Sequence, residues 1–157
     1  MKELEDKAEY DPPATITRLP SWLAGQVAAI AARLVAEALA DAGLRRQHFV
    51  VLSALAERGA ASQAALGRRL SIDRSDMHTL LGDLEQAGLV ARVRDELDNR
   101  RILIDLTLAG SRMLKRLNRH VEAAQNELVA PLSASERREL VRLLTRLVEH
   151  HTGRRFV

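Results

Sequence analysis

The sequence contains no cysteine, few aromatic residues and little glycine or proline. Without cysteine there are no disulfides, thiolate metal sites or thiol redox switches, and a reducing compartment suits such a chain. Aromatic residues make up 3% of the 157 residues and hydrophobic residues 46%, so the core must consist mainly of Leu, Val and Ala. With 8 Gly and 4 Pro, this Leu-, Ala-, Arg- and Glu-rich composition is typical of a mainly helical protein.

Long apolar runs are also lacking. No uninterrupted apolar run approaches the roughly 20 residues that a membrane-spanning helix needs, and residues 1–13 are charged, unlike a secretory signal. We therefore expect a cytoplasmic protein with no membrane partner. The net charge of +3 indicates little by itself, but the arginines cluster in residues 67–70, 92–101 and 136–146, and clustered cations favour nucleic-acid partners.

The first part of the chain reads as an arm followed by two helices. Residues 1–17 are polar and contain Asp11-Pro12-Pro13, which is incompatible with helix, so we interpret them as an N-terminal arm. Apolar residues then recur at helical spacing from about Leu19 to Asp41. A second amphipathic helix is expected from Arg45 to Arg58.

The middle of the chain predicts two short helices and a hairpin. Ser62 and Asp73 have the chemistry of helix N-caps, for helices over 63–70 and 74–87. The period then changes: residues 89–94 and 102–106 are short, rich in branched aliphatic side chains and separated by a polar turn. Such a pattern predicts a β-hairpin.

Two further helices are expected at the end of the chain. The first, from about Thr107 to Ala130, carries an apolar stripe, and Pro131 ends it. Ser133 and Glu136 form a capping-box pattern that begins the second. A helix of about 24 residues is about 36 Å long, longer than a small lobe is wide. We interpret its stripe as a core or a dimer interface rather than a cofactor site.

The order helix, short helix, short helix, hairpin predicts a mainly α fold with a small β-hairpin wing. Residues 45–106 would form a winged helix-turn-helix DNA-binding region, and residues 18–44 with 107–157 a helical dimerisation region. In this plan the second short helix is narrow enough to enter the major groove, and the hairpin reaches the neighbouring minor groove. Helical spacing leaves a polar set of side chains on the first turns of that reading helix: Arg74, Ser75, Asp76, His78 and Thr79.

From Gln47 to Leu114 the sequence resembles the MarR family of bacterial regulators. The resemblance is carried by Ala64-Ala65-Leu66-Gly67-Arg68-Arg69-Leu70, Asp73-Arg74-Ser75, Leu84-Glu85-Gln86-Ala87-Gly88-Leu89-Val90, Arg94-Asp95-Glu96-Leu97-Asp98-Asn99-Arg100-Arg101, Leu106-Thr107 and Gly110. It implies a two-fold dimer in which the first, fifth and sixth helices interlock. Many relatives bind small aromatic acids between the dimer and DNA-binding lobes.

The resemblance also implies roles for wing residues. Asp98 would brace Arg100, and Arg100 would enter the minor groove, with Arg94 and Arg101 beside it in the signature. The chain departs from the family pattern at three positions. Asp76 stands where a small hydroxyl residue is usual, Thr79 where a basic residue is frequent, and Asn99 where a second arginine is frequent.

Other candidate sites have weaker support. Trp22, Arg33 and His48 are candidate liners of a small aromatic effector site. His120, His150 and His151 lack cysteines or a tight cluster of acidic residues beside them, so we interpret them as surface or capping residues and expect no metal or other cofactor. No phosphate-binding loop or catalytic triad pattern is present, so we do not expect an enzyme.

Two functions remain open from the sequence. The first is a sequence-specific transcriptional regulator that binds a pseudo-palindromic DNA site as a homodimer; it would be a repressor or an activator, with or without release by a small ligand. The alternative is a winged-helix protein–protein assembly module without sequence-specific DNA binding, in which the basic wing is a docking surface. A docking module would expose apolar residues on these elements, whereas the reading helix and wing are polar. The sequence favours DNA.

Overall fold

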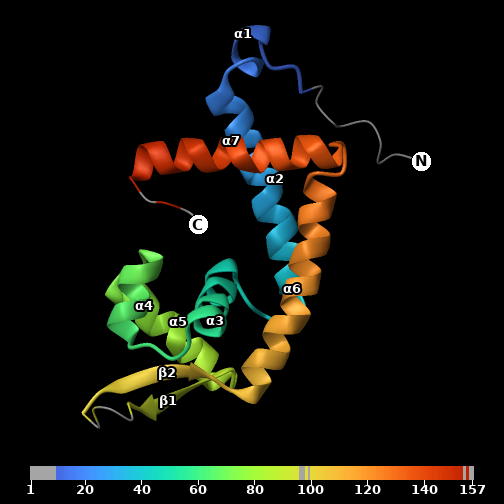
Figure 1. Ribbon diagram of the computed structural model, residues 1–157. Helices are drawn as coiled ribbons and strands as arrows, with labels where there is room; N and C mark the ends of the chain where they lie inside the picture. The colour runs from blue at the N-terminus through green and yellow to red at the C-terminus, as the bar shows by residue number, and fades with distance from the viewer. Residues whose placement is uncertain (1–9, 96–97, 99, 154, 156–157) are drawn as a thin grey trace.

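The computed structural model describes residues 10–95, 98, 100–153 and 155. It is mainly helical with one two-stranded antiparallel hairpin, as predicted. The elements, in chain order (Figure 1), are α1 (Ala14–Thr17), α2 (Pro20–Ala40), α3 (Arg46–Arg58), α4 (Gln63–Leu70), α5 (Arg74–Gln86), β1 (Val90–Arg94), β2 (Ile102–Leu106), α6 (Leu108–Leu128) and α7 (Ala134–Thr152).

Local capping explains where several helices begin. The hydroxyl of Ser62 accepts from the backbone N–H of Ala65, and the hydroxyl of Ser133 accepts from that of Glu136 while Glu136 accepts from the N–H of Ser133. The capping box predicted at the start of α7 is therefore confirmed. The helix α1 was not predicted. Pro13 immediately precedes it, and the carbonyl of Pro13 is the first hydrogen-bond acceptor of the helix. A proline is tolerated where a helix begins, so the Pro12-Pro13 pair does not prevent a helix from residue 14.

The winged lobe consists of α3, α4, α5 and the hairpin, with the first turns of α6. Its core is almost purely aliphatic, as the shortage of aromatic residues requires, and its fully buried members include Leu52, Leu66, Met77, Leu81, Leu84 and Ile104. In the hairpin, Val90 pairs with Leu106 and Arg94 with Ile102. Ala61 extends the pairing, since it exchanges two backbone hydrogen bonds of 3.0 and 2.8 Å with Ile104.

A tight joint connects the reading helix, the wing and α6. The Thr107 hydroxyl donates to the carbonyl of Gly88 at 2.7 Å and accepts from the N–H of Gly110 at 2.9 Å. Gly110 is buried, and a Cβ there would overlap the backbone carbonyl of Leu89. The end of α5 and the start of α6 are thus held in contact, so the long helix leaves the winged lobe in a fixed direction.

The helices α2 and α6 pack along each other (Figure 1), and this pair buries Leu34, Leu117 and Ala124. The helix α7 crosses near the outer end of this pair in Figure 1 and has no buried side chain among the described residues. We refer to α2 and α7 as the outer helices. The large apolar side chains that remain exposed on them, on α1 and at the N-cap of α2 are Ile16, Leu19, Leu23, Val27, Ile30, Val141, Leu143, Leu144, Leu147 and Val148.

By length and composition alone, α2 is apolar enough to cross a membrane. A search for uninterrupted apolar runs misses this helix, because Arg33 and Glu37 interrupt its apolar sequence. The two side chains form an ion pair of 3.0 Å on the helix surface. An apolar helix that packs against protein passes the same test, and α2 packs against α6.

Candidate nucleic-acid interface

A short turn sets the angle between α4 and α5. Ser71 takes up the left-handed conformation (φ 55°) at the end of α4, and the N–H of Ile72 donates to the carbonyl of Gly67 at 3.0 Å. A Cβ on Gly67 would lie 3.0 Å from the carbonyl oxygen of Ile72, so the turn passes close to the helix. These constraints hold the two helices in the compact arrangement of a helix-turn-helix.

Asp73 caps the reading helix α5. Its carboxylate accepts the backbone N–H groups of Ser75 at 2.8 Å and Asp76 at 2.9 Å, and also the Ser75 hydroxyl at 2.8 Å. These hydrogen bonds, the one from the Asp76 backbone first, hold the pKa of Asp73 below its ordinary value. The N-cap predicted from sequence is therefore confirmed, and it orders the turn that carries the candidate DNA contacts.

The exposed surface of α5 has a neutral centre and two different flanks. Met77, Leu80, Leu81 and Leu84 are buried, and a rotation of about 100° per residue places Ser75, Thr79 and Gly82 opposite them. The same rotation places Arg74 and His78 on one flank and Asp76 and Asp83 on the other. All five predicted positions, Arg74, Ser75, Asp76, His78 and Thr79, are exposed.

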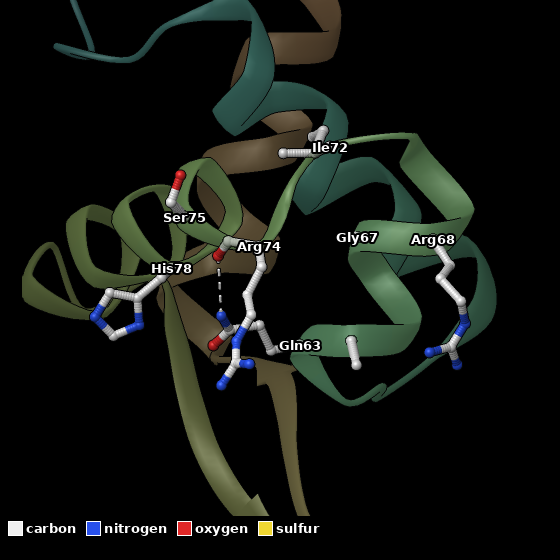
Figure 2. Close-up of a pocket in the computed structure, with 8 residues that line it drawn as sticks. Gln63, Gly67, Arg68, Ile72, Arg74, Ser75 and His78 are labelled. Atoms are coloured by element: carbon white, nitrogen blue, oxygen red, sulfur yellow. Dashed lines mark hydrogen bonds between the residues drawn. The ribbon is translucent and has the colours of Figure 1, made fainter.

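The basic flank borders a groove of about 990 Å³ between α4 and α5. Arg68, Arg74 and His78 are among the residues that line it; in Figure 2 the side chains of Arg68 and Arg74 extend toward the bottom of the view, and the ring of His78 extends to the left. The side-chain amide of Gln63 donates to the carbonyl of Arg74 at 3.4 Å. The arginine cluster at 67–70 is evident in the sequence, but no role for Gln63 or Arg68 was predicted. Their contribution depends on the packing of α4 against α5, which spacing within one helix does not reveal.

The acidic flank begins with Asp76. A hydrogen bond with the carboxyl group of Asp73, and then the charge of Asp73, raise the pKa of Asp76 above its ordinary value, while the charge of Arg45 acts in the opposite direction. Negative charge is favourable at a helix N-terminus but unfavourable beside phosphates. Asp83 is paired with Arg45 at 3.1 Å, so Asp76 is the residue of this flank that disfavours close approach of the DNA backbone, and the basic flank favours it.

At the tip of the wing, Asp98 organises the backbone. Its carboxylate accepts the N–H of Arg100 at 3.1 Å, and its carbonyl accepts the N–H of Arg101 at 2.8 Å. Asp98 thus contacts Arg100 through the main chain, rather than through the guanidinium. Arg101 forms a long ion pair of 3.8 Å with Asp95. Asn99 lies outside the described residues.

The other wing arginines differ in their pairing. Arg92 on β1 forms an ion pair of 3.1 Å with Glu85 on α5, which joins the wing to the reading helix. This contact was not predicted from sequence. Within the described part of the chain, Arg94 and Arg100 are exposed and form no ion pair. No described acidic side chain neutralises these two guanidinium groups.

The three candidate effector liners lie in different surroundings. Trp22 is half-buried in α2, and Arg33, which is paired with Glu37, lies about 16 Å further along the same helix. His48 is 3% exposed, and both of its ring nitrogens have partners within the protein. A shared effector site stays a prediction. Among the described residues there is no group of three or more His, Cys, Asp or Glu that could hold a metal ion.

Known proteins with similar sequences are regulators of transcription. Residues 42–101 match the sequence model of the MarR family. The chain is 35% identical over 126 residues to the HTH-type transcriptional repressor Rv2887 of Mycobacterium tuberculosis, a match that covers 80% of this chain and 91% of that protein.

Solved structures of MarR-family proteins have a similar fold. The M. tuberculosis MarR family protein Rv2887 in complex with DNA superposes with a TM-score of 0.70 at 33% identity, covering 87% of this chain and 98% of that one. The apo form of wild-type MarR from Escherichia coli superposes with a TM-score of 0.71 at 25% identity, covering 83% and 97%. With its capped reading helix and arginine-bearing wing, the chain belongs to the MarR family of winged-helix transcriptional regulators.

Proposed function

We propose that this protein is a cytoplasmic repressor that binds a pseudo-palindromic double-stranded DNA site as a homodimer. The observation that carries the proposal is the exposed polar face of α5, bordered by Arg74 and His78, beside a wing whose Arg94 and Arg100 form no ion pair within the described part of the chain. The relative Rv2887 is named a transcriptional repressor, and its structure was solved with DNA.

Each part of this surface suits a different part of a duplex. The neutral centre of α5, with Ser75 and Thr79, is small. Its two hydroxyls donate to Asp73 and to the carbonyl of Ser75, so their oxygens can accept hydrogen bonds from base edges in the major groove. Arg68 and Arg74 border the groove on the basic flank and suit phosphates, which supply most of the salt-dependent affinity. A wing arginine suits the narrow and electronegative minor groove.

The dimer is proposed from the exposed apolar side chains of the outer helices. Leu23, Val27 and Ile30 of α2 are each between 45% and 47% exposed, and Leu147 of α7 is 58% exposed. Large exposed apolar patches mark interaction surfaces, and a second copy of the chain would cover these helices in an isologous contact. Two-fold symmetry then gives one reading helix to each half-site.

Val93 and Ile102, both exposed on the hairpin, favour a second candidate function. Apolar side chains on a wing suit the alternative, a protein–protein assembly module. The two functions differ in how binding depends on salt, because a protein that releases counterions from phosphates loses affinity steeply as salt rises. A docking module would not bind random duplex DNA in this salt-dependent manner.

The test is selection of bound duplexes from a random pool, followed by footprinting and a salt titration on the enriched site. We expect an inverted repeat with half-sites about one helical turn, or roughly 10 base pairs, apart. A single asymmetric half-site at saturating protein would contradict the dimer, and failure to enrich any duplex would contradict DNA binding itself.

We extend the proposal to release by a small aromatic effector that contacts Trp22, which offers an aromatic surface for stacking. Arg33 lies about 16 Å further along α2 and is paired with Glu37. Both ring nitrogens of the buried His48 have partners within the protein, so we do not assign Arg33 or His48 to the same small effector as Trp22. Aromatic carboxylates that weaken operator binding by the wild type should have less effect on Trp22→Ala. An equal response in the variant would remove Trp22 from the effector site.

A further inference from the structure

Among the described residues, His48 is the one polar side chain that is buried. It lies in the first turn of α3, and its imidazole reaches between the start of that helix and the reading helix α5. Buried polar groups need partners, and His48 has a partner for each nitrogen.

The hydrogen bonds fix which nitrogen carries the proton. Nδ1 accepts the backbone N–H of Arg45 at 3.0 Å, so it must be unprotonated. The ring is then neutral, and Nε2–H donates to Oδ2 of Asp83 on α5 at 3.2 Å. The guanidinium of Arg45 donates to the same oxygen at 3.1 Å. Neutral His48 therefore accepts the N–H of Arg45 at the start of α3, and its hydrogen bond to Asp83 holds α5 against α3.

We propose that His48 is a positioning residue for the reading helix α5. Its protonation loosens the His48–Asp83 contact that holds α5 against α3, and DNA binding weakens as the pH falls. The inference rests on the proposed DNA binding. It gives His48 a role in the regulator that does not require contact with DNA.

Protonation of His48 disturbs the contact between α3 and α5 at two points. A proton on Nδ1 would face the N–H of Arg45, so that hydrogen bond, which satisfies the first turn of α3, is lost. The imidazolium would also share one carboxylate oxygen with a guanidinium, which places two cations side by side. The added attraction between imidazolium and Asp83 cannot restore the lost bond at Arg45.

The surroundings keep the ring neutral in the folded protein. Burial lowers the pKa of His48 below 6.5, the hydrogen bond with Asp83 raises it, and the charge of Arg45 lowers it further. Among the described residues, the charged groups that act on this pKa are Arg45, at the start of α3, and Asp83, on α5; none comes from α2, α4, α6 or β2, which also contact α3.

The sign of the pH effect follows from this depressed pKa. The unfolded chain takes up a proton on this histidine near pH 6.5, whereas the folded joint resists it until lower pH. The stabilisation is complete above pH 6.5 and declines as the pH falls toward the folded pKa of His48. Over the same pH interval, fewer molecules have the His48–Asp83 contact that holds α5 in place.

Asp83 links the joint to the surface that would read DNA. It lies on the same flank of α5 as Asp76, about two turns further along. The charge of Arg45 also acts on the pKa of Asp76, which it lowers. A helix released at Asp83 is freer to roll about its axis, and a roll moves Ser75 and Thr79 away from the base edges.

The test compares the wild type with His48→Gln. A glutamine at this position accepts the Arg45 N–H with its amide oxygen, as in a capping box, and can donate to Asp83 with its amide nitrogen, but it does not titrate. Affinity for the selected operator is measured from about pH 8 to about pH 5.5 at constant ionic strength, across the histidine range. Circular dichroism at each pH confirms that both proteins stay folded.

Relative to its own value at high pH, wild-type affinity should fall more steeply than that of His48→Gln, by up to about tenfold per pH unit when one proton is linked. All other titratable groups are present in both proteins, so their own pH effects cancel in the comparison. Identical profiles for the two folded proteins would overturn the inference and leave the proposed function standing. If neither protein binds DNA even at high pH, the proposed function is wrong and the inference falls with it.

A second variant separates positioning from general stability. Asp83→Asn keeps an acceptor for the ring but removes the carboxylate that raises the pKa of His48. The midpoint of the affinity loss should therefore move to lower pH. A midpoint that does not move would show that the His48–Asp83 joint does not govern DNA binding.

Discussion

Arginine side chains around the interface differ in whether an acidic partner neutralises them. Arg45, Arg92 and Arg101 pair with Asp83, Glu85 and Asp95 respectively. Exposed ion pairs of this kind contribute about 0–1 kcal/mol each, so they mainly orient side chains. Arg94 and Arg100 form no ion pair within the described part of the chain, so a contact with phosphate would break none of the described ion pairs.

Arg100→Ala should weaken binding to all duplexes by a similar factor. The contact is electrostatic and therefore largely independent of sequence, and the slope of log affinity against log salt should fall by about one unit. Arg101→Ala is the matched control, because Arg101 is already paired with Asp95 and should affect affinity less. Unchanged affinity of Arg100→Ala on every duplex would overturn the assignment of the wing.

Gly110→Ala should destabilise the protein, because the added Cβ would overlap the carbonyl of Leu89. Overpacking of this kind costs about 1–3 kcal/mol. Gly82→Ala is the control: a Cβ there would meet nothing within 4 Å beyond its chain neighbours and the backbone of its own helix, and replacing glycine within a helix should add up to about 1 kcal/mol. Urea unfolding of both variants gives the comparison. Equal stabilities would show that the Gly110 joint relaxes freely.

The exposed candidates of α5 could be predicted from sequence because they depend only on helical periodicity. Arg74, Ser75 and Thr79 are exposed simply because Met77 and Leu81 are buried. The contact between His48 and Asp83 could not be predicted, because it joins side chains 35 residues apart. Such a contact depends on how α3 packs against α5, and neither helix carries that information in its own spacing.

At the scale of elements, helix starts were predictable for a similar reason. Ser62, Asp73 and Ser133 each cap the helix that follows through hydrogen bonds within three residues, so a local pattern suffices. The helix α1 was missed because the pair Pro12-Pro13 dominates its neighbourhood, although the second proline only precedes its first turn. The groove between α4 and α5 could not be predicted either, because it depends on how two helices and the turn between them pack together.

The reading helix has one basic and one acidic flank, which should fix its orientation in a groove. Asp76→Ala removes both the charge and the acceptor oxygens from this flank, so affinity for non-specific duplex should rise. If Asp76 accepts from a cytosine amino group, discrimination at one base pair should fall by between about fivefold and about 150-fold. Binding assays on the selected site and its single-base variants, at two salt concentrations, give both quantities. Unaltered preference with lower stability would mean that Asp76 only favours the helix N-terminus.

For the whole molecule, the outer helices should hold two copies together. Leu144→Glu combined with Leu147→Glu places charges on the exposed apolar face of α7 and should convert the dimer to monomers at about micromolar concentration, since buried unpaired charges are costly. Leu108→Glu is the matched control, because Leu108 is 75% exposed at the start of α6. Sedimentation velocity reports the mass. A wild type that sediments as a folded monomer would contradict the proposed assembly.

The helix α6 extends without interruption from the joint at Gly110 to the outer helices (Figure 1). As a rigid rod of 21 residues, it is about 31 Å long, and a tilt of about 10° at its outer end would displace the other end by about 5 Å. In a dimer anchored at the outer helices, two-fold symmetry would apply that displacement to both winged lobes, in opposite directions. The rod would then act as a lever arm, and such a change of angle would alter the half-site spacing by up to about 10 Å, comparable with roughly three base-pair steps of about 3.4 Å.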